Sequence, residues 1–207
     1  MPAAIHPGAV LHGWDHFVIT LRDDTGRRSA FLSLYAITYS ATLGAGQVAF
    51  LRVDDPAASL NVVVTDAPEV AARMKERLAR MGHTEVDLRG PSVEALFTRH
   101  HVGPSGFGFA ISWQAHTVEA RWIEPSAPFW MMAPAPDLRA DEDIWALFVE
   151  AHRASMTVDG RPVVGEPFPD DVWVSKLGRP LSSAHVALSE VRVRPVSGES
   201  GDGAAEE

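Results

Sequence analysis

The chain has 207 residues and a formal net charge of −9, because 27 acidic side chains outnumber 18 lysines and arginines. Hydrophobic residues make up 46% of the sequence and cysteine is absent, which excludes disulfide scaffolds, thiolate metal sites and cysteine nucleophiles. The acidic balance provides no electrostatic basis for binding nucleic acid or an anionic membrane. We therefore expect a globular protein with a sizeable core and with neither nucleic acid nor membrane as a partner.

The two ends of the chain add expectations about location and order. The first residues lack the positive charge and apolar run of a secretory signal, and no segment reaches the roughly 18 apolar residues that span a bilayer, so cytoplasmic residence is expected. Residues 196–207 are rich in glycine and acidic residues and hold nothing to bury, which predicts a disordered acidic tail. We expect residues 1–195 to form a single β-rich domain, with a subdivision, if there is one, near 125–140, where prolines cluster.

Short runs rich in β-branched and aromatic residues dominate the first 123 residues and predict strands. They are interrupted by one helical pattern at 66–82, in which Asp66 is the expected N-cap, Pro68 lies in the first turn and Gly82 ends the helix. The predicted strands are 17–22, 29–40, 47–53, 60–65, 85–89, 94–102, 107–113 and 117–123.

The remainder of the chain is predicted to hold a second helix and two further β elements. Residues 141–154 begin with three acidic side chains and carry an apolar stripe at helical spacing, so a helix is expected there. Asp159-Gly160 is a strong hairpin signal within 156–164, and 171–177 is expected to be a short helix that Gly178 ends. The last strand is predicted at 185–194.

About ten strands with two packed helices indicate an α+β, β-rich fold. The short connections favour antiparallel neighbours, so we expect a mostly antiparallel curled sheet or barrel around an interior cavity, and a lipocalin-like barrel is one form of it. Residues 60–123 read strand, helix and three strands, an order that resembles the βαβββ module of the vicinal oxygen chelate (glyoxalase-like) enzymes. Residues 14–18 also look like the opening of such a module. In that family the first strand of a module supplies a metal ligand, whereas residues 61–64 contain neither histidine nor glutamate.

No sequence motif for a bound cofactor is present. The chain has no phosphate-binding loop, no dinucleotide fingerprint, no nucleophile elbow and no paired-histidine zinc motif. We therefore predict no cofactor and no metal, and any chemistry must come from His, Tyr, Ser, Thr, Lys or carboxylate side chains.

Histidine and tyrosine supply the candidate catalytic residues. Strand alternation places Trp14 and His16 on one face and Asp15 on the other. In the pair His100-His101 the two rings must point to opposite faces, so one of them is expected to enter a cavity and relay a proton. A phenol in an apolar cavity can donate to a carbonyl oxygen, as Tyr35 would. The predicted catalytic residues are His16, His101 and Tyr35, and a purely structural role remains the alternative for each.

Five further residues are predicted to contact a substrate. Trp130 and Met132 lie in an aromatic and thioether run flanked by prolines, which can line a cavity mouth, form a self-association patch that would make a homodimer, or pack in the core. The predicted substrate-binding residues are Trp14, Tyr39, His100, Trp130 and Met132.

Two functions follow from these candidates. The first is a cofactor-independent enzyme of isomerase, cyclase or hydro-lyase type, which uses acid–base chemistry on a small, largely apolar molecule. The second is a non-catalytic protein that binds or carries such a ligand. The enzyme hypothesis requires that at least two residues among Trp14, His16, Tyr35, His100 and His101 meet in one concave pocket.

Overall fold

A computed structural model of the chain describes residues 9–55, 58–102, 106–133 and 142–193. The predicted tail at 196–207 and residues 134–140 of the expected subdivision near 125–140 lie outside these ranges. The elements in chain order are β1 (Val10–Arg22), β2 (Arg28–Ser40), β3 (Gly46–Asp55), β4 (Ala58–Thr65), α1 (Pro68–Arg80), β5 (Ser92–Glu94), β6 (Leu96–His101), β7 (Gly106–Trp113), β8 (His116–Pro125), β9 (Phe129–Ala133), β10 (Glu142–Val158), β11 (Arg161–Pro162), β12 (Pro169–Asp170), η2 (Asp171–Trp173), α2 (Val174–Leu177), β13 (Leu181–Ser182) and β14 (Ala184–Val193).

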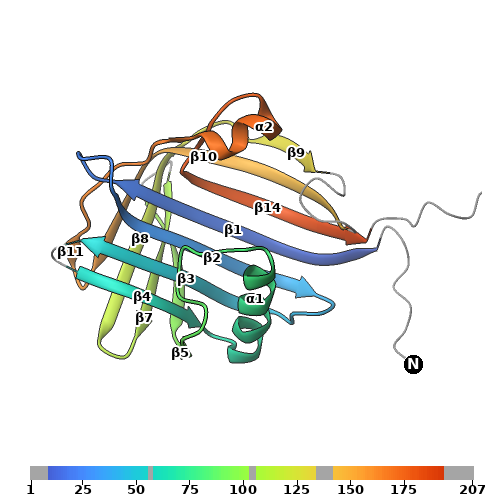
Figure 1. Ribbon diagram of the computed structural model, residues 1–207, viewed down its shortest axis with the longest axis horizontal. Helices are drawn as coiled ribbons and strands as arrows, with labels where there is room; N and C mark the ends of the chain where they lie inside the picture. Colours follow the sequence, from blue (N-terminus) through green and yellow to red (C-terminus); the bar gives the residue numbers. More distant parts are fainter. Residues whose placement is uncertain (1–8, 56–57, 103–105, 134–141, 194–207) are drawn as a thin grey trace, which may run out of the picture.

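Twelve of these strands form one curled sheet in the order β5-β4-β3-β2-β1-β14-β10-β8-β7-β6, with β9 and β11 also paired to β10 (Figure 1). All neighbours are antiparallel except β4 and β5, which run parallel. The strands at the two ends of this order, β5 and β6, are separated in the chain only by Ala95. The chain therefore connects the two ends of the sheet and nearly closes a barrel, which confirms the predicted β-rich, mostly antiparallel architecture.

The interior of the barrel is filled by side chains. Phe17, Ile19 and Leu21 alternate along β1 toward the interior and are fully buried. They meet Phe109 and Trp122 from the opposite part of the sheet, and the Trp122 indole N–H donates to the Val18 carbonyl at 2.9 Å. Because this part of the interior is packed, the cavities described below lie on the outer face of the sheet and at its open end.

The helix α1 forms where the sequence predicts it and covers the outer face of β2, β3 and β4 (Figure 1). Its apolar side packs Val70, Met74 and Leu78 into a second core cluster. The predicted cap is wrong, because the N-cap residue is Ala67 and no side chain caps the helix. The Asp66 carboxylate instead accepts a hydrogen bond from the Gln47 backbone N–H at 2.6 Å.

The predicted helix at 141–154 is wrong, because residues 142–158 form the long strand β10. Buried residues recur at every second position in each half of this segment, but the alternation is interrupted near residues 151–153, and apolar residues such as Trp145 and Leu147 also lie on the less buried side. The sequence therefore shows no clean period of two that would indicate a strand. Pairing with β14 and β9 along its first half and with β8 along its second half decides the conformation. No strand forms at 85–89 either.

The predicted hairpin within 156–164 and the short helix near 171–177 are confirmed. The hairpin after β10 turns at Asp159 and Gly160, which both have positive φ. A short helical segment, η2 followed by α2, ends at Gly178 in the left-handed conformation. Among the described residues, no helix is both long and apolar enough to cross a membrane.

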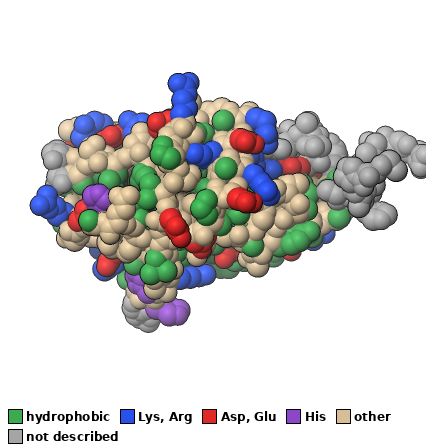
Figure 2. Space-filling view, turned by 90° about the horizontal axis from the view of Figure 1, so that it is seen from below, with side chains coloured by type: hydrophobic (Ala, Val, Ile, Leu, Met, Phe, Trp, Pro, Cys, Tyr) green, Lys and Arg blue, Asp and Glu red, His purple; other side chains and the backbone are tan. Residues whose placement is uncertain are grey.

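Figure 2 shows a face of the molecule on which acidic, basic and apolar side chains are interspersed.

Candidate functional site

A cavity of about 230 Å³ lies on the outer face of the sheet, beneath α1. We call it the α1 cavity. Its polar lining groups are His16, Tyr35, Arg77 and Ser189, and most of its wall is apolar. The apolar wall includes Met74, Leu78, Met131, Ile144, Phe148 and Trp173.

Strand register explains why the α1 cavity is open. His16 lies directly opposite Tyr35 on β2 and opposite Ala187 on β14. Small side chains line this part of the sheet, since Ala146, Ala187 and Ser189 occupy the outer face of β10 and β14. The larger rings around these small residues cannot fill the remaining space.

His16 is held as a neutral imidazole. Its ring stacks on the Tyr35 ring, with centroids 4.0 Å apart and planes inclined by 8°. Its Nε2 is hydrogen-bonded to the Ser33 hydroxyl at 2.8 Å. Burial lowers the pKa of His16 to about 3, and the nearby His185 and His83 act in the same direction. His16 can therefore accept or donate a hydrogen bond at neutral pH without carrying charge.

Tyr35 is held as a protonated phenol. Burial raises the pKa of Tyr35 to about 12, although the Ser33 hydroxyl and the Arg77 charge favour the ionised form. The indole of Trp14 packs edge-on against the phenol ring at 5.8 Å. Tyr35 is thus a neutral hydrogen-bond donor in a mostly apolar environment.

Arg77 brings a fixed positive charge to the cavity wall. Its guanidinium forms a buried ion pair with Glu142, at 2.8 Å between Nη2 and Oε2, and Nη1 lies 3.3 Å from His12 Nε2. Because arginine can only donate, His12 Nε2 accepts this bond, and the ring proton is on Nδ1, which faces the Ser40 hydroxyl at 2.7 Å. The Trp14 indole packs against both side chains: it stacks on the His12 ring, with centroids 5.2 Å apart, and its ring lies 5.4 Å from the Arg77 guanidinium carbon.

Three of the sequence-predicted site residues, Trp14, His16 and Tyr35, meet in the α1 cavity. This satisfies the geometric condition set for the enzyme hypothesis. The others lie elsewhere. His100 lies on β6 and packs over Gly108 of the neighbouring strand β7, and His101 and Tyr39 are exposed. Trp130 and Met132 are exposed on β9.

Sequence reasoning did not select Arg77 or Glu142 for the site, and it placed His12 on the same face as Trp14 and His16 without including it among the predicted site residues. Local patterns in a helix, such as i,i+4 pairs and caps, do not distinguish a buried arginine from an exposed one. The sequence around Arg77 therefore does not indicate that this side chain is buried. Its partner Glu142 is 65 residues away in the chain, in the segment predicted to be helical. Only the folded sheet brings the two together.

The described residues contain no group of three or more His, Asp or Glu side chains placed to hold a metal ion. The α1 cavity itself offers one imidazole, one phenol, one hydroxyl, one guanidinium and the indoles of Trp14 and Trp173. This donor set is suited to hydrogen bonding with a small molecule.

No protein-family model and no curated protein sequence matches the chain. Among solved structures, the chain is similar to an acetoacetate decarboxylase from Legionella pneumophila subsp. pneumophila str. Philadelphia 1, at 11% sequence identity and a TM-score of 0.40. The match covers 94% of this chain and 90% of that chain. A similarity of this size assigns neither a family nor an activity.

Proposed function

We propose that the protein binds a small, largely apolar molecule in the α1 cavity, and that the molecule carries one hydrogen-bond acceptor such as a carbonyl oxygen. The observation that carries the proposal is the pair of neutral polar rings, His16 and Tyr35, stacked within an apolar wall. A phenol with a raised pKa donates to an acceptor without ionising, and the nearby Arg77 charge favours the electron-rich end of the ligand.

The size of the α1 cavity supports a small ligand. Its volume, about 230 Å³, lies below the roughly 300–1,000 Å³ typical of sites for drug-sized molecules. A single aromatic or alicyclic ring with a short substituent is the matching class. Acetophenone has this shape and one carbonyl, and ethylbenzene has nearly the same shape without the carbonyl.

The test compares these two probes on the purified full-length protein by saturation-transfer NMR and titration. A hydrogen bond of about 1.4 kcal/mol corresponds to a tenfold preference for acetophenone. The preference should disappear in Tyr35→Phe and remain in Tyr39→Phe, a control that removes the exposed phenol of the same strand. Equal binding of the two probes by the wild type, or an unchanged preference in Tyr35→Phe, contradicts the proposal.

A catalytic role is the second candidate, because the stacked His16 and Tyr35 are both groups that can carry a proton. Tyr35 would protonate or polarise the ligand oxygen, as an isomerase, cyclase or hydro-lyase requires. We rank this function second because an imidazole with a pKa of about 3 is a weak general base at neutral pH.

Deuterium exchange separates catalysis from binding. In D₂O, enolisation replaces the methyl protons of acetophenone by deuterons, and NMR follows the loss of the methyl signal. Exchange that is faster than in buffer and abolished in Tyr35→Phe supports catalysis. Exchange at the buffer rate, together with carbonyl-selective binding, leaves binding as the function.

A further inference from the structure

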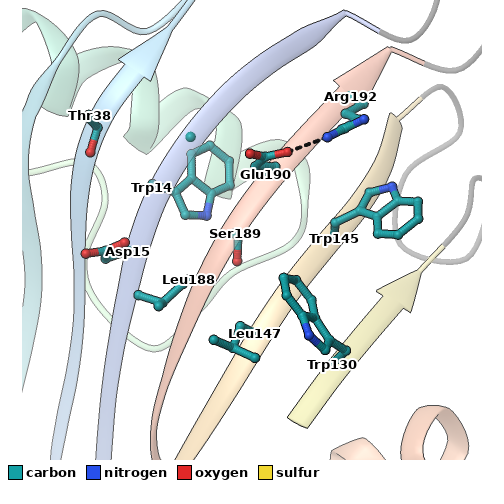
Figure 3. A pocket seen from close by; sticks show the side chains of 11 residues that line it. Trp14, Asp15, Thr38, Trp130, Trp145, Leu147, Leu188, Ser189, Glu190 and Arg192 are labelled. Carbon is teal, nitrogen blue, oxygen red and sulfur yellow. Dashed lines mark hydrogen bonds and ion pairs between the residues drawn. The ribbon is translucent and has the colours of Figure 1, made fainter. Parts of the chain in front are cut away.

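A second concave site lies on the opposite face of the same strands, at the open end of the barrel (Figure 3). We propose that this bowl, of about 530 Å³, binds a flat aromatic molecule that carries a cationic amine. The inference goes beyond the proposed function, since the bowl and the α1 cavity lie on opposite faces of the sheet and share only Trp14 and Ser189 among their lining residues. Its volume lies within the range typical of small-molecule sites, about 300–1,000 Å³.

The floor of the bowl is a row of side chains in direct register across four strands. Asp15 on β1 lies opposite Leu188 on β14, Leu188 opposite Leu147 on β10, and Leu147 opposite Trp130 on β9. With neighbouring strands about 4.8 Å apart, the row is about 14 Å long. It continues the face of β1 that carries Phe17 into the barrel interior. The row thus runs from a carboxylate at one end to an indole at the other (Figure 3).

The apolar part of the bowl is unusually exposed. The exposed fraction is 72% for Trp130, 43% for Trp145 and 39% for Leu188. The Trp130 indole stands beside Leu147, and the Trp145 indole lies further along β10 on the same side (Figure 3). Clusters of exposed aromatic side chains in a concavity are more typical of binding sites than of ordinary protein surface. A flat aromatic ring would bury these side chains efficiently.

The charges of the bowl favour a cationic ligand. Among the described residues, no donor makes a hydrogen bond to the half-buried Asp15 carboxylate, and its ion-pair partner Arg99 is 4.0 Å away. Arg192 is already bound to Glu190 at 2.7 Å, and its guanidinium lies over the Trp145 ring at 5.8 Å. A cation therefore already contacts an indole of this site, and Asp15 is the carboxylate still able to accept an ammonium group.

Gly13 allows the bowl to be filled without disturbing the fold. It lines the bowl, its φ is not positive, and a Cβ added there would have no described heavy atom within 4 Å beyond its chain neighbours. Gly13→Leu should therefore fold and occupy the space of a ligand. Asp15→Asn is nearly isosteric and removes only the charge.

The experiment measures binding of three naphthalene probes to the full-length protein by isothermal titration calorimetry at pH 7. The probes are 1-naphthylmethylamine, 1-naphthalenemethanol and the carboxylate 1-naphthaleneacetate. At pH 7 they are cationic, neutral and anionic, respectively. The amine should bind at least tenfold more tightly than the alcohol, and the acetate most weakly. Asp15→Asn should bring the amine to the level of the alcohol. Gly13→Leu should weaken both at least tenfold, while Tyr35→Phe in the α1 cavity should leave them unchanged.

Three results would overturn the proposal. One is a wild-type protein that shows no preference for the amine. Another is binding that Tyr35→Phe removes and Gly13→Leu does not, which would place the probes in the α1 cavity. The third is a stable dimer in sedimentation velocity that Trp130→Ala dissociates and that excludes the amine, which would make the bowl a surface for a second copy of this chain.

Discussion

The buried ion pair between Arg77 and Glu142 gives the sharpest prediction about stability. Their side chains are only 9% and 7% exposed, and the charged atoms are 2.8 Å apart. Glu142→Gln keeps the shape of the side chain but removes its negative charge. The guanidinium of Arg77 cannot lose its proton, so a positive charge would remain buried without its carboxylate partner.

The expected loss of stability is large. Removing one partner of a buried pair costs about 3–5 kcal/mol, and domains of this size have total stabilities of about 5–15 kcal/mol. In Glu142→Gln, His12 Nε2 still accepts a hydrogen bond from the guanidinium, which partly compensates the charge. We therefore expect a loss of stability of about 3 kcal/mol, the smallest value of this range. The double variant Arg77→Met with Glu142→Leu removes both charges and should lose less than Glu142→Gln alone.

Urea unfolding followed by tryptophan fluorescence measures these differences. With a slope of about 2 kcal/mol/M, a loss of 3 kcal/mol lowers the midpoint by about 1.5 M. The matched control is Glu119→Gln, which breaks the exposed pair with Arg121, at a similar distance of 2.7 Å but with side chains 38% and 45% exposed. That variant should lose less than about 1 kcal/mol. A loss in Glu142→Gln no greater than in Glu119→Gln would refute the reasoning from burial.

Three further predictions concern stability, and urea denaturation measures each of them. Burial holds the pKa of His16 at about 3, so between pH 6.5 and 3 the unfolded chain binds the proton that the folded chain does not. Stability should therefore fall as pH falls, by up to about 1.4 kcal/mol per pH unit, and His16→Gln should flatten this dependence. Gly165→Ala should cost about 2 kcal/mol or more, because φ is +137° and the added Cβ would lie 2.8 Å from the Arg22 carbonyl oxygen. Trp122→Phe should cost about 2–4 kcal/mol, because it leaves a void and removes the hydrogen bond to Val18. Unchanged midpoints in these variants would contradict the packing described for each site.

Strands with one buried face could be predicted from the sequence. Along β7, Phe109, Ile111 and Trp113 are buried on one side and alternate with smaller or polar residues. The same alternation assigned Trp14 and His16 to one face of β1 and Asp15 to the other. A period of two is decisive where one face meets a core and the other does not.

The parts that could not be predicted depend on contacts between distant segments. In β10, Ile144, Leu147 and Phe148 also fit a helical stripe, and only pairing with β14 and β9 selects the strand. The pairing of Arg77 with Glu142 depends on the same strand. An error in one element therefore hid both the long strand and the charged wall of the α1 cavity.

The alternation of β1 also divides the chemistry of the molecule between two faces. Trp14 and His16 contribute to a cavity whose polar groups are neutral donors and a cation, whereas Asp15 contributes a carboxylate to an aromatic bowl. A ligand with a hydrogen-bond acceptor would therefore bind on one face of the sheet, and a ligand with a positive charge would bind on the other face. Trp14 and Ser189 border both sites, so any coupling between the two ligands must pass through these residues or the backbone that holds them. Since a β-sheet this well paired has one rigid arrangement, we expect the two sites to bind independently, with equal affinity for 1-naphthylmethylamine in the presence and absence of acetophenone.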